Sequence, residues 1–209
     1  MHVYFVRHGE TVLNRKNVHQ SPSTPLSPEG REQALTVAEA LRGMNPDLLL
    51  TSGYTRARET AGTIGLCTGL VSTISGLFCE IVRPSSLYGK SHFHPSTLTY
   101  VLLSILNKDN VSWRYEDAEN FNDISTRAKS ALAHLESLHG THESVIVVSH
   151  TVFINIMVSY LCNDRMLAVR DLLPIFLHVK RMKNTDIIHL EYAPSVGSNT
   201  CSWIEKGKI

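Results

Sequence analysis

The sequence has almost no excess of charge of either sign. Its 209 residues include 20 Lys and Arg against 19 Asp and Glu, which gives a formal net charge of +1. A chain that binds nucleic acid or an anionic membrane surface over a broad face usually carries a clear positive excess. The balance gives no electrostatic argument for either partner. Any attraction of this chain for an anion must come from a local cluster of basic residues.

Paired cysteines and long apolar runs are also missing. The spacing of the four cysteines, which include no C-x-x-C pair, favours free thiols over a zinc site or a disulfide framework; they are Cys67, Cys79, Cys162 and Cys201. The first residues lack the basic start, apolar core and cleavage site of a signal peptide. Polar side chains interrupt the most apolar stretch, residues 145–161, which favours a buried strand and helix over a membrane span. We therefore expect a cytoplasmic protein.

The residues that are present fit one folded domain over residues 1–209. Hydrophobic residues make up 43% of the chain and charged residues 19%, which is ordinary for a globular protein. A chain of 209 residues is long enough to bury a substantial core. The composition is compatible with a monomer and with a homodimer.

Strand patterns and helix patterns alternate along the chain. Continuous apolar runs predict buried strands at residues 3–6, 47–50 and 145–148. Apolar periodicity and capping residues predict helices at 28–42, 55–67, 96–106, 123–138 and 151–161. Residues 14–26 and 81–95 are expected to be loops. Weaker patterns predict a short strand within 71–80, two antiparallel edge strands within 175–192, and a mostly irregular tail from residue 194.

The order of these elements predicts the fold class. Strand, loop and helix recur at least three times, and the strands are apolar throughout rather than on one side only. This is typical of a three-layer α/β/α domain with a mainly parallel central sheet. In such sheets ligands bind beyond the carboxyl ends of the strands. Because Arg7-His8, residues 52–56 and His150 all follow strands, we expect two arginines and two histidines on one side of the sheet.

These residue types suit the chemistry of a phosphate monoester. Arg7 and Arg56 can neutralise the dianion, since a guanidinium fork matches phosphate oxygens. A neutral imidazole at His8 can attack phosphorus and form a covalent intermediate. His150 can donate a ring N–H to a phosphate oxygen as charge spreads in the transition state. A carboxylic acid is then needed to protonate the departing oxygen.

Several blocks of the sequence resemble the histidine phosphatase superfamily, the phosphoglycerate mutase-like proteins. The blocks are RHGET at 7–11, Asn14, PLSPEGREQA at 25–34, Ser52, RARET at 56–60 and VVSH at 147–150. The resemblance covers residues 1–66 and 143–162 well and is diffuse over 81–140. It implies a phosphoglycerate mutase-like α/β fold. It also implies a reaction that passes through a phosphohistidine.

The resemblance implies a role for six residues. They are the nucleophile His8, the phosphate-pocket residues Arg7, Arg56 and His150, the additional phosphate contact Asn14, and the general acid Glu80. The family's general acid follows the third strand of the sheet, and Glu80 occupies the matching position.

Two departures from the family pattern bear on function. Thr151 follows His150 where the family usually has glycine, and its hydroxyl would be an additional contact for substrate. The tandem arginines of true mutases are absent from residues 81–125, which we expect to form a loop and helix insertion over the substrate. Arg83 is isolated there and is expected to contact substrate. Because a mutase must hold a second phosphate, the missing pair favours hydrolysis.

The preferred interpretation is a metal-independent phosphatase that acts on a small phosphorylated molecule and needs no cofactor. His92 and His94 have no companion cysteine or nearby acid, so they are weak evidence for a metal site. Two alternatives stay open. One is a phosphotransferase or isomerase of the phosphoglycerate mutase type, and the other is a non-catalytic phosphate-binding interaction protein on the same fold.

Overall fold

The computed structural model describes residues 1–161, 182–194 and 201–209. Within them, six strands form one sheet in the order β3-β2-β4-β1-β5-β6. Strands β3, β2, β4 and β1 are mutually parallel, and β5 pairs antiparallel with both β1 and β6. The strands are β1 (His2–Arg7), β2 (Leu48–Thr51), β3 (Ser72–Ile74), β4 (Ser144–Ser149), β5 (Ile187–Tyr192) and β6 (Trp203–Lys208).

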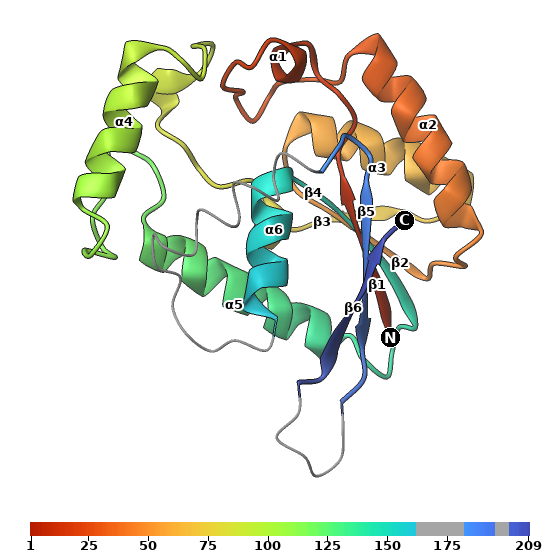
Figure 1. Cartoon of the computed structure of the whole chain (residues 1–209). Helices are drawn as coiled ribbons and strands as arrows, with labels where there is room; N and C mark the ends of the chain where they lie inside the picture. Colours follow the sequence, from red (N-terminus) through yellow and green to blue (C-terminus); the bar gives the residue numbers. More distant parts are fainter. Residues whose placement is uncertain (162–181, 195–200) are drawn as a thin grey trace.

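Helices cover both faces of this sheet. The helices are α1 (Val12–Arg15), α2 (Pro28–Arg42), α3 (Thr55–Thr68), α4 (Pro95–Leu106), α5 (Phe121–Ser137) and α6 (Thr151–Tyr160). Side chains of α2 and α3 share one apolar cluster with the sheet, and side chains of α5 and α6 share another. Figure 1 shows these two helical layers on either side of the strands. The predicted three-layer α/β/α fold with a mainly parallel sheet is confirmed.

Strand β1 shows how the sequence fills both layers. Val3 and Phe5 belong to the cluster beneath α5 and α6, whereas Tyr4 and Val6 belong to the cluster beneath α2 and α3. Alternate side chains of a strand point to opposite faces. Because helices cover both faces, every one of these positions is apolar or aromatic. A central strand with no polar face is thus the reason for the continuous apolar run in the sequence.

Helix α2 begins where its capping residues predict. The Ser27 hydroxyl accepts the N–H of Gly30 at 3.0 Å, and Pro28 occupies the first turn. The loop after β1 lies directly against this first turn, since a Cβ on Gly30 would be 2.0 Å from the carbonyl oxygen of Glu10. A Cβ on Gly9 would be 2.3 Å from the carbonyl oxygen of Gly30. These two glycines therefore allow the backbone beside His8 to contact α2.

The predictions for the C-terminal region are partly wrong. The tail from residue 194 contains strand β6, and β5 lies between β1 and β6 rather than at the edge of the sheet. Residues 175–181, where the first of two edge strands was expected, lie outside the described residues. Along β6 only Trp203 is buried. A polar edge strand of this kind lacks the apolar alternation on which a sequence prediction depends.

Two smaller expectations also need correction. Residues 14–26 were expected to be a loop, but Asn14 and Arg15 belong to the one-turn helix α1, where the Thr11 hydroxyl accepts the Asn14 N–H. Cys67 and Cys79 are free thiols, whereas Cys201 is disulfide-bonded, so the expectation of free thiols is wrong for Cys201. No helix in the described part of the chain has the length and hydropathy that crossing a membrane requires.

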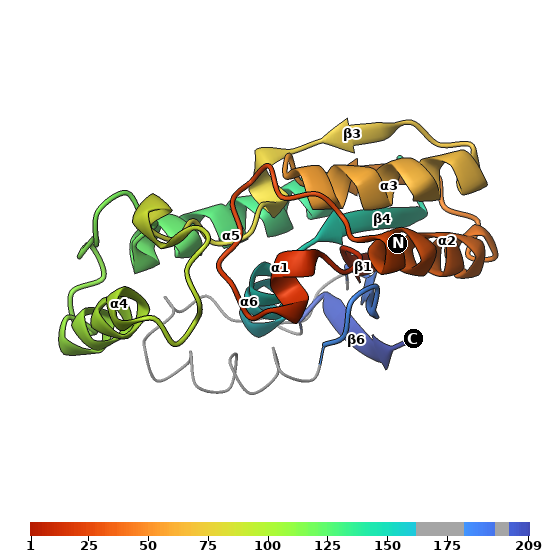
Figure 2. The same ribbon diagram turned by 90° about the horizontal axis from the view of Figure 1, so that it is seen from above.

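The segment at about 81–125 extends away from the sheet. Figures 1 and 2 both show its helix α4 far from the strands. The segment is joined to the loop after α1, because the His19 N–H donates to the Lys90 carbonyl and the Gly89 N–H donates to the His19 carbonyl, each at 2.9 Å. Two loops far apart in the sequence thus lie side by side.

We expect Gly30→Ala to destabilise the protein by about 1–3 kcal/mol, the usual range for forcing atoms into a packed site. Alanine favours helices by about 0.5–1 kcal/mol over glycine, but its Cβ would collide with the Glu10 carbonyl. Gly62→Ala in α3 is the matched control, since a Cβ there meets nothing within 4 Å. Urea unfolding should show opposite signs for the two variants. Equal stabilisation by both would contradict the close contact.

Candidate active site

The candidate site lies at the carboxyl ends of three neighbouring strands. Arg7, the last residue of β1, pairs with Ser149 at the end of β4, and β2 lies on the other side of β4. The His8 N–H donates to the Ser149 carbonyl at 3.1 Å, which extends this alignment by one residue. The imidazole rings of His8 and His150 are consequently 5.1 Å apart between centroids. The parallel sheet thus brings together residues 142 positions apart, as expected.

His8 has one ring nitrogen fixed and the other available as an electron-pair donor. Its Nδ1 lies 2.7 Å from the carbonyl oxygen of Gly9, which can only accept, so the ring proton is on Nδ1. Its Nε2 accepts the Nε–H of Arg56 at 3.1 Å. Burial, followed by the charges of Arg56 and Arg7, holds the pKa of His8 well below the usual 6.5. The imidazole is therefore neutral at neutral pH, with its lone pair on Nε2.

Arg56 comes from the first turn of α3 and contacts three parts of the site. Besides the bond to His8, its Nη1 donates to the Ser21 carbonyl at 3.0 Å. Its guanidinium lies 5.1 Å from the centre of the Tyr54 ring. Burial lowers the pKa of Arg56 to about 10, with the nearby charge of Glu80 acting in the opposite direction. Arg56 therefore still carries its positive charge at neutral pH.

His150 is completely buried and leaves one ring nitrogen without a partner. Its Nε2 lies 2.7 Å from the hydroxyl of Ser52, which also accepts the Tyr54 N–H at 3.2 Å. Since that hydroxyl already accepts one proton, its own proton is available to Nε2, and this favours a ring proton on Nδ1. Burial, Arg56 and His8 hold the pKa of His150 well below 6.5. Its Nδ1 has no hydrogen-bond partner among the described residues.

Arg7 supplies a second buried donor of this kind. Its Nη1 donates to the Met182 carbonyl at 2.5 Å, whereas its Nε has no partner among the described residues. Burial lowers the pKa of Arg7, and the charges of Glu80 and Asp186 partly offset that effect. Buried donors without partners are rare in folded proteins. An oxyanion between Arg7 and His150 would satisfy both.

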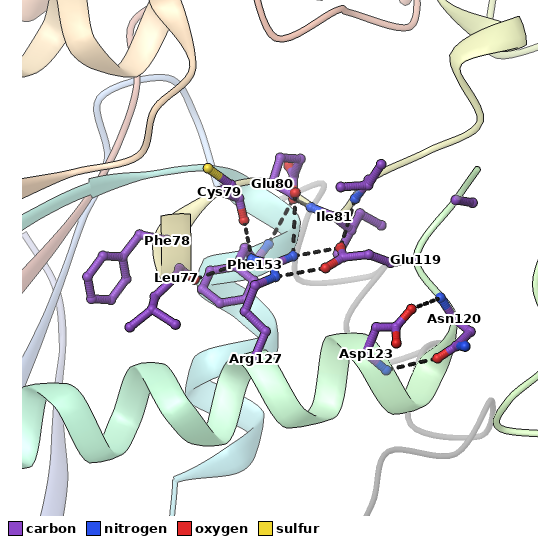
Figure 3. Close-up of polar contacts among 12 residues, drawn as sticks. Leu77, Phe78, Cys79, Glu80, Ile81, Glu119, Asn120, Asp123, Arg127 and Phe153 are labelled. Carbon is purple, nitrogen blue, oxygen red and sulfur yellow. Dashed lines mark hydrogen bonds and ion pairs between the residues drawn. The ribbon is translucent and has the colours of Figure 1, made fainter. Parts of the chain in front are cut away.

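Glu80 lies on a loop, two residues after the 3₁₀ turn Gly76–Phe78, and its carboxylate contacts the first turn of α6. One carboxylate oxygen accepts the N–H groups of Ile81 at 3.0 Å and Phe153 at 3.1 Å, and the other accepts the N–H of Val152 at 3.3 Å. Figure 3 shows the carboxylate beside Phe153. Since α6 directly follows His150, these bonds place the carboxylate close to His150.

The three remaining candidate residues differ in position. Asn14 lies beside His8, because Asn184 donates from Nδ2 to the His8 carbonyl at 3.1 Å and to the Asn14 side-chain oxygen at 3.4 Å. Thr151 is the buried first residue of α6. Arg83 is in the neighbouring loop, where its Nη1 is 3.5 Å from Nδ1 of His19. Asn14 and Thr151 therefore adjoin the central cluster, and Arg83 lies outside it.

Sequence reasoning missed two side chains that the structure brings to the site. Tyr54 contacts His150 edge-on at 5.0 Å between ring centroids, and Asn184 bridges His8 and Asn14. Tyr54 sits between Ser52 and Arg56, so its position beside the predicted residues was the available signal. No sequence signal marked Asn184, because asparagine is common in turns whether or not a site is present.

His92 and His94 do not form part of a metal cluster. The His92 ring packs against His19 at 4.5 Å between centroids, and the His94 side chain accepts the Ser96 N–H at the start of α4. The described ranges contain no group of three or more His, Cys, Asp or Glu side chains that could hold a metal ion.

Comparison with known proteins identifies the family. A family model described as the histidine phosphatase superfamily (branch 1) matches residues 3–197, which is most of the chain. The chain belongs to this superfamily. A relative named probable phosphoglycerate mutase GpmB, from Citrobacter koseri, is 27% identical over 222 residues, covering 100% of this chain and 90% of the relative.

Solved structures share the histidine phosphatase fold. A mycobacterial glucosyl-3-phosphoglycerate phosphatase aligns with a TM-score of 0.73 and 21% identity, covering 98% of this chain and 97% of the other. A variant of phosphoserine phosphatase from Entamoeba histolytica, in complex with phosphoserine, aligns with a TM-score of 0.73 and 19% identity, covering 99% and 95%. At these identities the likeness shows the shared fold.

We expect the rings of His8 and His150 to stay neutral as the pH falls through the usual histidine pKa near 6.5. Both pKa values are lowered, so protons bind only well below pH 6.5. Ring nitrogen chemical shifts measured by NMR, assigned with His8→Ala and His150→Ala, would report this. A midpoint near pH 6.5 for either ring would contradict the neutral, buried pair.

Proposed function

We propose that this histidine phosphatase superfamily member hydrolyses the phosphate monoester of a small molecule, without a metal, through a phosphohistidine on Nε2 of His8. The observation that carries the proposal is the state of the His8 ring. It is neutral, its proton is held on Nδ1 by Gly9, and its Nε2 lone pair faces the Nε–H of Arg56. A neutral imidazole fixed in this way is a suitable nucleophile toward phosphorus.

Substrate binding would use the donors that surround His8. The phosphate would accept the Nε–H of Arg7 and the Nδ1–H of His150, which lack partners among the described residues. Arg56 would turn its Nε–H from His8 to a phosphate oxygen and so free the lone pair. Asn14, next to the His8 backbone, and Thr151, at the start of α6, would add contacts. These donors would offset charge that develops on phosphoryl oxygens in the transition state.

The first half-reaction transfers the phosphoryl group to the protein. The bond between Nε2 of His8 and phosphorus forms as the bond between phosphorus and the leaving oxygen breaks. Glu80, as the carboxylic acid, gives its proton to that oxygen. The carbonyl of Gly9 keeps the Nδ1 proton of His8 in place and stabilises the positive charge that the ring acquires.

The second half-reaction releases phosphate. Glu80, now a carboxylate, takes a proton from water as the water oxygen bonds to phosphorus. The Nε2–P bond breaks, and neutral His8 and protonated Glu80 are restored. One carboxyl group thus serves as acid and then as base.

The names of similar proteins support a phosphatase without fixing its substrate. The two solved structures described above are a phosphatase for glucosyl-3-phosphoglycerate and a phosphoserine phosphatase. Both names specify a small phosphorylated molecule. The cytoplasmic location expected for this chain stays a prediction; the free thiols at Cys67 and Cys79 support it, whereas the disulfide-bonded Cys201 does not. The absence of nucleic-acid and membrane partners and the homodimer stay predictions.

A mutase is the second candidate, because the curated relative at 27% identity is named a probable phosphoglycerate mutase. A mutase needs cations that hold a second anionic group while phosphate is transferred. In the described part of residues 81–125, Arg114 is occupied by Asp123 and by the Ala118 carbonyl. Arg83 lies beside His19, and it is an isolated cation whose charge acts on Arg56. This distribution favours hydrolysis.

We expect His8→Ala to lower phosphate release from p-nitrophenyl phosphate by at least about 10³-fold, because it removes the nucleophile. The assay contains EDTA, and the wild type should retain its activity there. After denaturation in alkali, wild type quenched during turnover of ³²P-labelled substrate should carry acid-labile phosphate, and His8→Ala should carry none.

The matched control is His139→Ala, since His139 packs against Tyr192 outside the site. It should leave turnover unchanged. Activity that persists in His8→Ala, or that EDTA abolishes, would overturn the proposal. Phosphate bound without turnover would favour the non-catalytic alternative. Phosphate transferred to a second phosphoglycerate carbon, with little release, would favour the mutase.

We expect Glu80→Gln to slow hydrolysis of alkyl phosphates by about 10²–10⁴-fold, the usual contribution of a general acid. Formation of the phosphohistidine from p-nitrophenyl phosphate, measured as the pre-steady-state burst of p-nitrophenol, should fall much less, because this leaving group departs without a proton and the step does not use Glu80 as a base. Glu32→Gln changes an exposed carboxylate of α2 and is the control. Equal losses for both substrate classes would show that Glu80 is not the acid.

A further inference from the structure

We propose that Arg127 of α5 is a positioning residue that holds the general acid, Glu80, at the phosphate pocket. The proposal rests on the function proposed above, since it assigns Arg127 a task in that reaction. Arg127 lies on a helix that contributes no side chain to the phosphate pocket itself. Its guanidinium nevertheless reaches the segment that carries Glu80, as Figure 3 shows.

Arg127 uses all five of its N–H bonds on this segment and on one carboxylate. Nη1 donates to the carbonyls of Leu77 at 3.3 Å and Cys79 at 2.7 Å, and Nη2 donates to the carbonyl of Glu80 at 3.5 Å. Nε and Nη2 donate to the two carboxylate oxygens of Glu119 at 2.8 and 2.7 Å. Arginine is the only side chain with five donors in a fixed plane.

Glu119 extends the same contact to the other side of Glu80. Its carboxylate accepts the Val82 N–H at 2.9 Å, and its own N–H donates to the Val82 carbonyl at 2.9 Å. The side chains of Arg127 and Glu119 are only 15% and 14% exposed. The pair therefore holds the backbone both before and after Glu80 in a largely buried environment, where such bonds are strong.

Arg127 also contacts the helix that orients the carboxylate. Its guanidinium lies 4.3 Å from the centre of the Phe153 ring, and the backbone N–H of Phe153 donates to the Glu80 carboxylate. Arg127 thus joins α5, the backbone of Glu80 and the start of α6. Without it, the Glu80 segment would lose three carbonyl contacts and the Glu119 carboxylate would lose its cation. A displacement of about 1 Å at a catalytic group can cost about 10²-fold in rate.

The deciding variant is Arg127→Lys, which keeps the charge beside Glu119 but has three donors and no planar fork. We expect kcat for an alkyl phosphate to fall about 10–10²-fold, whereas KM and the rate of the p-nitrophenol burst from p-nitrophenyl phosphate change little. In a Glu80→Gln background, Arg127→Lys should cause no further loss, because both changes remove the same function. A loss that is equal for both substrates, or additive with Glu80→Gln, would overturn the proposal.

The matched control is Arg114→Lys. Arg114 also donates to a single carboxylate, Asp123 of α5, and to one carbonyl, but among the described residues it makes no hydrogen bond to the Glu80 segment. It should leave the alkyl phosphate rate unchanged. Glu119→Gln is a second test should Arg127→Lys fold poorly. It preserves an acceptor for Val82 while removing the ion pair, and it should reproduce the selective loss.

An NMR measurement separates this proposal from the proposed function. The amide protons of Ile81 and Val152 donate to the Glu80 carboxylate, so Glu80→Gln should change their chemical shifts, to the same extent in the wild-type and the Arg114→Lys background. In an Arg127→Lys background this change in shift should fall by at least about half, because the carboxylate is no longer held against them. An undiminished change in shift would overturn the positioning role even in a protein without turnover.

Discussion

The structure depends on holding two guanidinium groups, Arg7 and Arg56, inside the protein beside the uncharged ring of His8. Burial opposes their charge and lowers the pKa of both. Backbone carbonyls of Met182 and Ser21 and the nearby charge of Glu80 offset part of that cost. Burial, together with the same two charges, lowers the pKa of His8 and so keeps its ring neutral. Buried cationic groups whose N–H donors lack acceptors are energetically unfavourable. The phosphate dianion proposed as the ligand would supply the missing acceptors.

Because the central strands are parallel, this arrangement of site residues can be predicted from the sequence. Strands β1, β2 and β4 have helices on both faces, so their sequences are continuous apolar runs that end at polar residues. Their neighbouring carboxyl ends then place Arg7, His8 and His150 together without any further assumption. Strand β6 was not predicted, because it is not an apolar strand buried between two helical layers. It is an edge strand with one buried residue, and its identity as a strand depends on pairing with β5.

The same contrast explains which site residues could be predicted. His8 and His150 could be predicted as site residues from their residue type and from their position directly after a strand. Asn184 and Arg127 act on backbone carbonyls, and every residue has a carbonyl, so nothing in the sequence marks their partners. Helix α5 was expected close to its observed bounds, yet a helical pattern does not reveal which groups the Arg127 side chain contacts. The positioning role proposed for Arg127 depends on the five acceptors that surround its guanidinium in the folded protein.

The proposed phosphate pocket and the proposed general acid are consequently supported by different parts of the fold. Strand ends fix the pocket, whereas Glu80 lies on a loop whose backbone is held by α5 and whose carboxylate is held by α6. Residues 81–125 connect that loop to α5, and Glu119 near their end contacts Val82 at their start. Changes within this segment can therefore alter access to the substrate while the paired ends keep Glu80 in place. This separation gives a physical reason why proteins that share this fold can be named for different phosphorylated molecules.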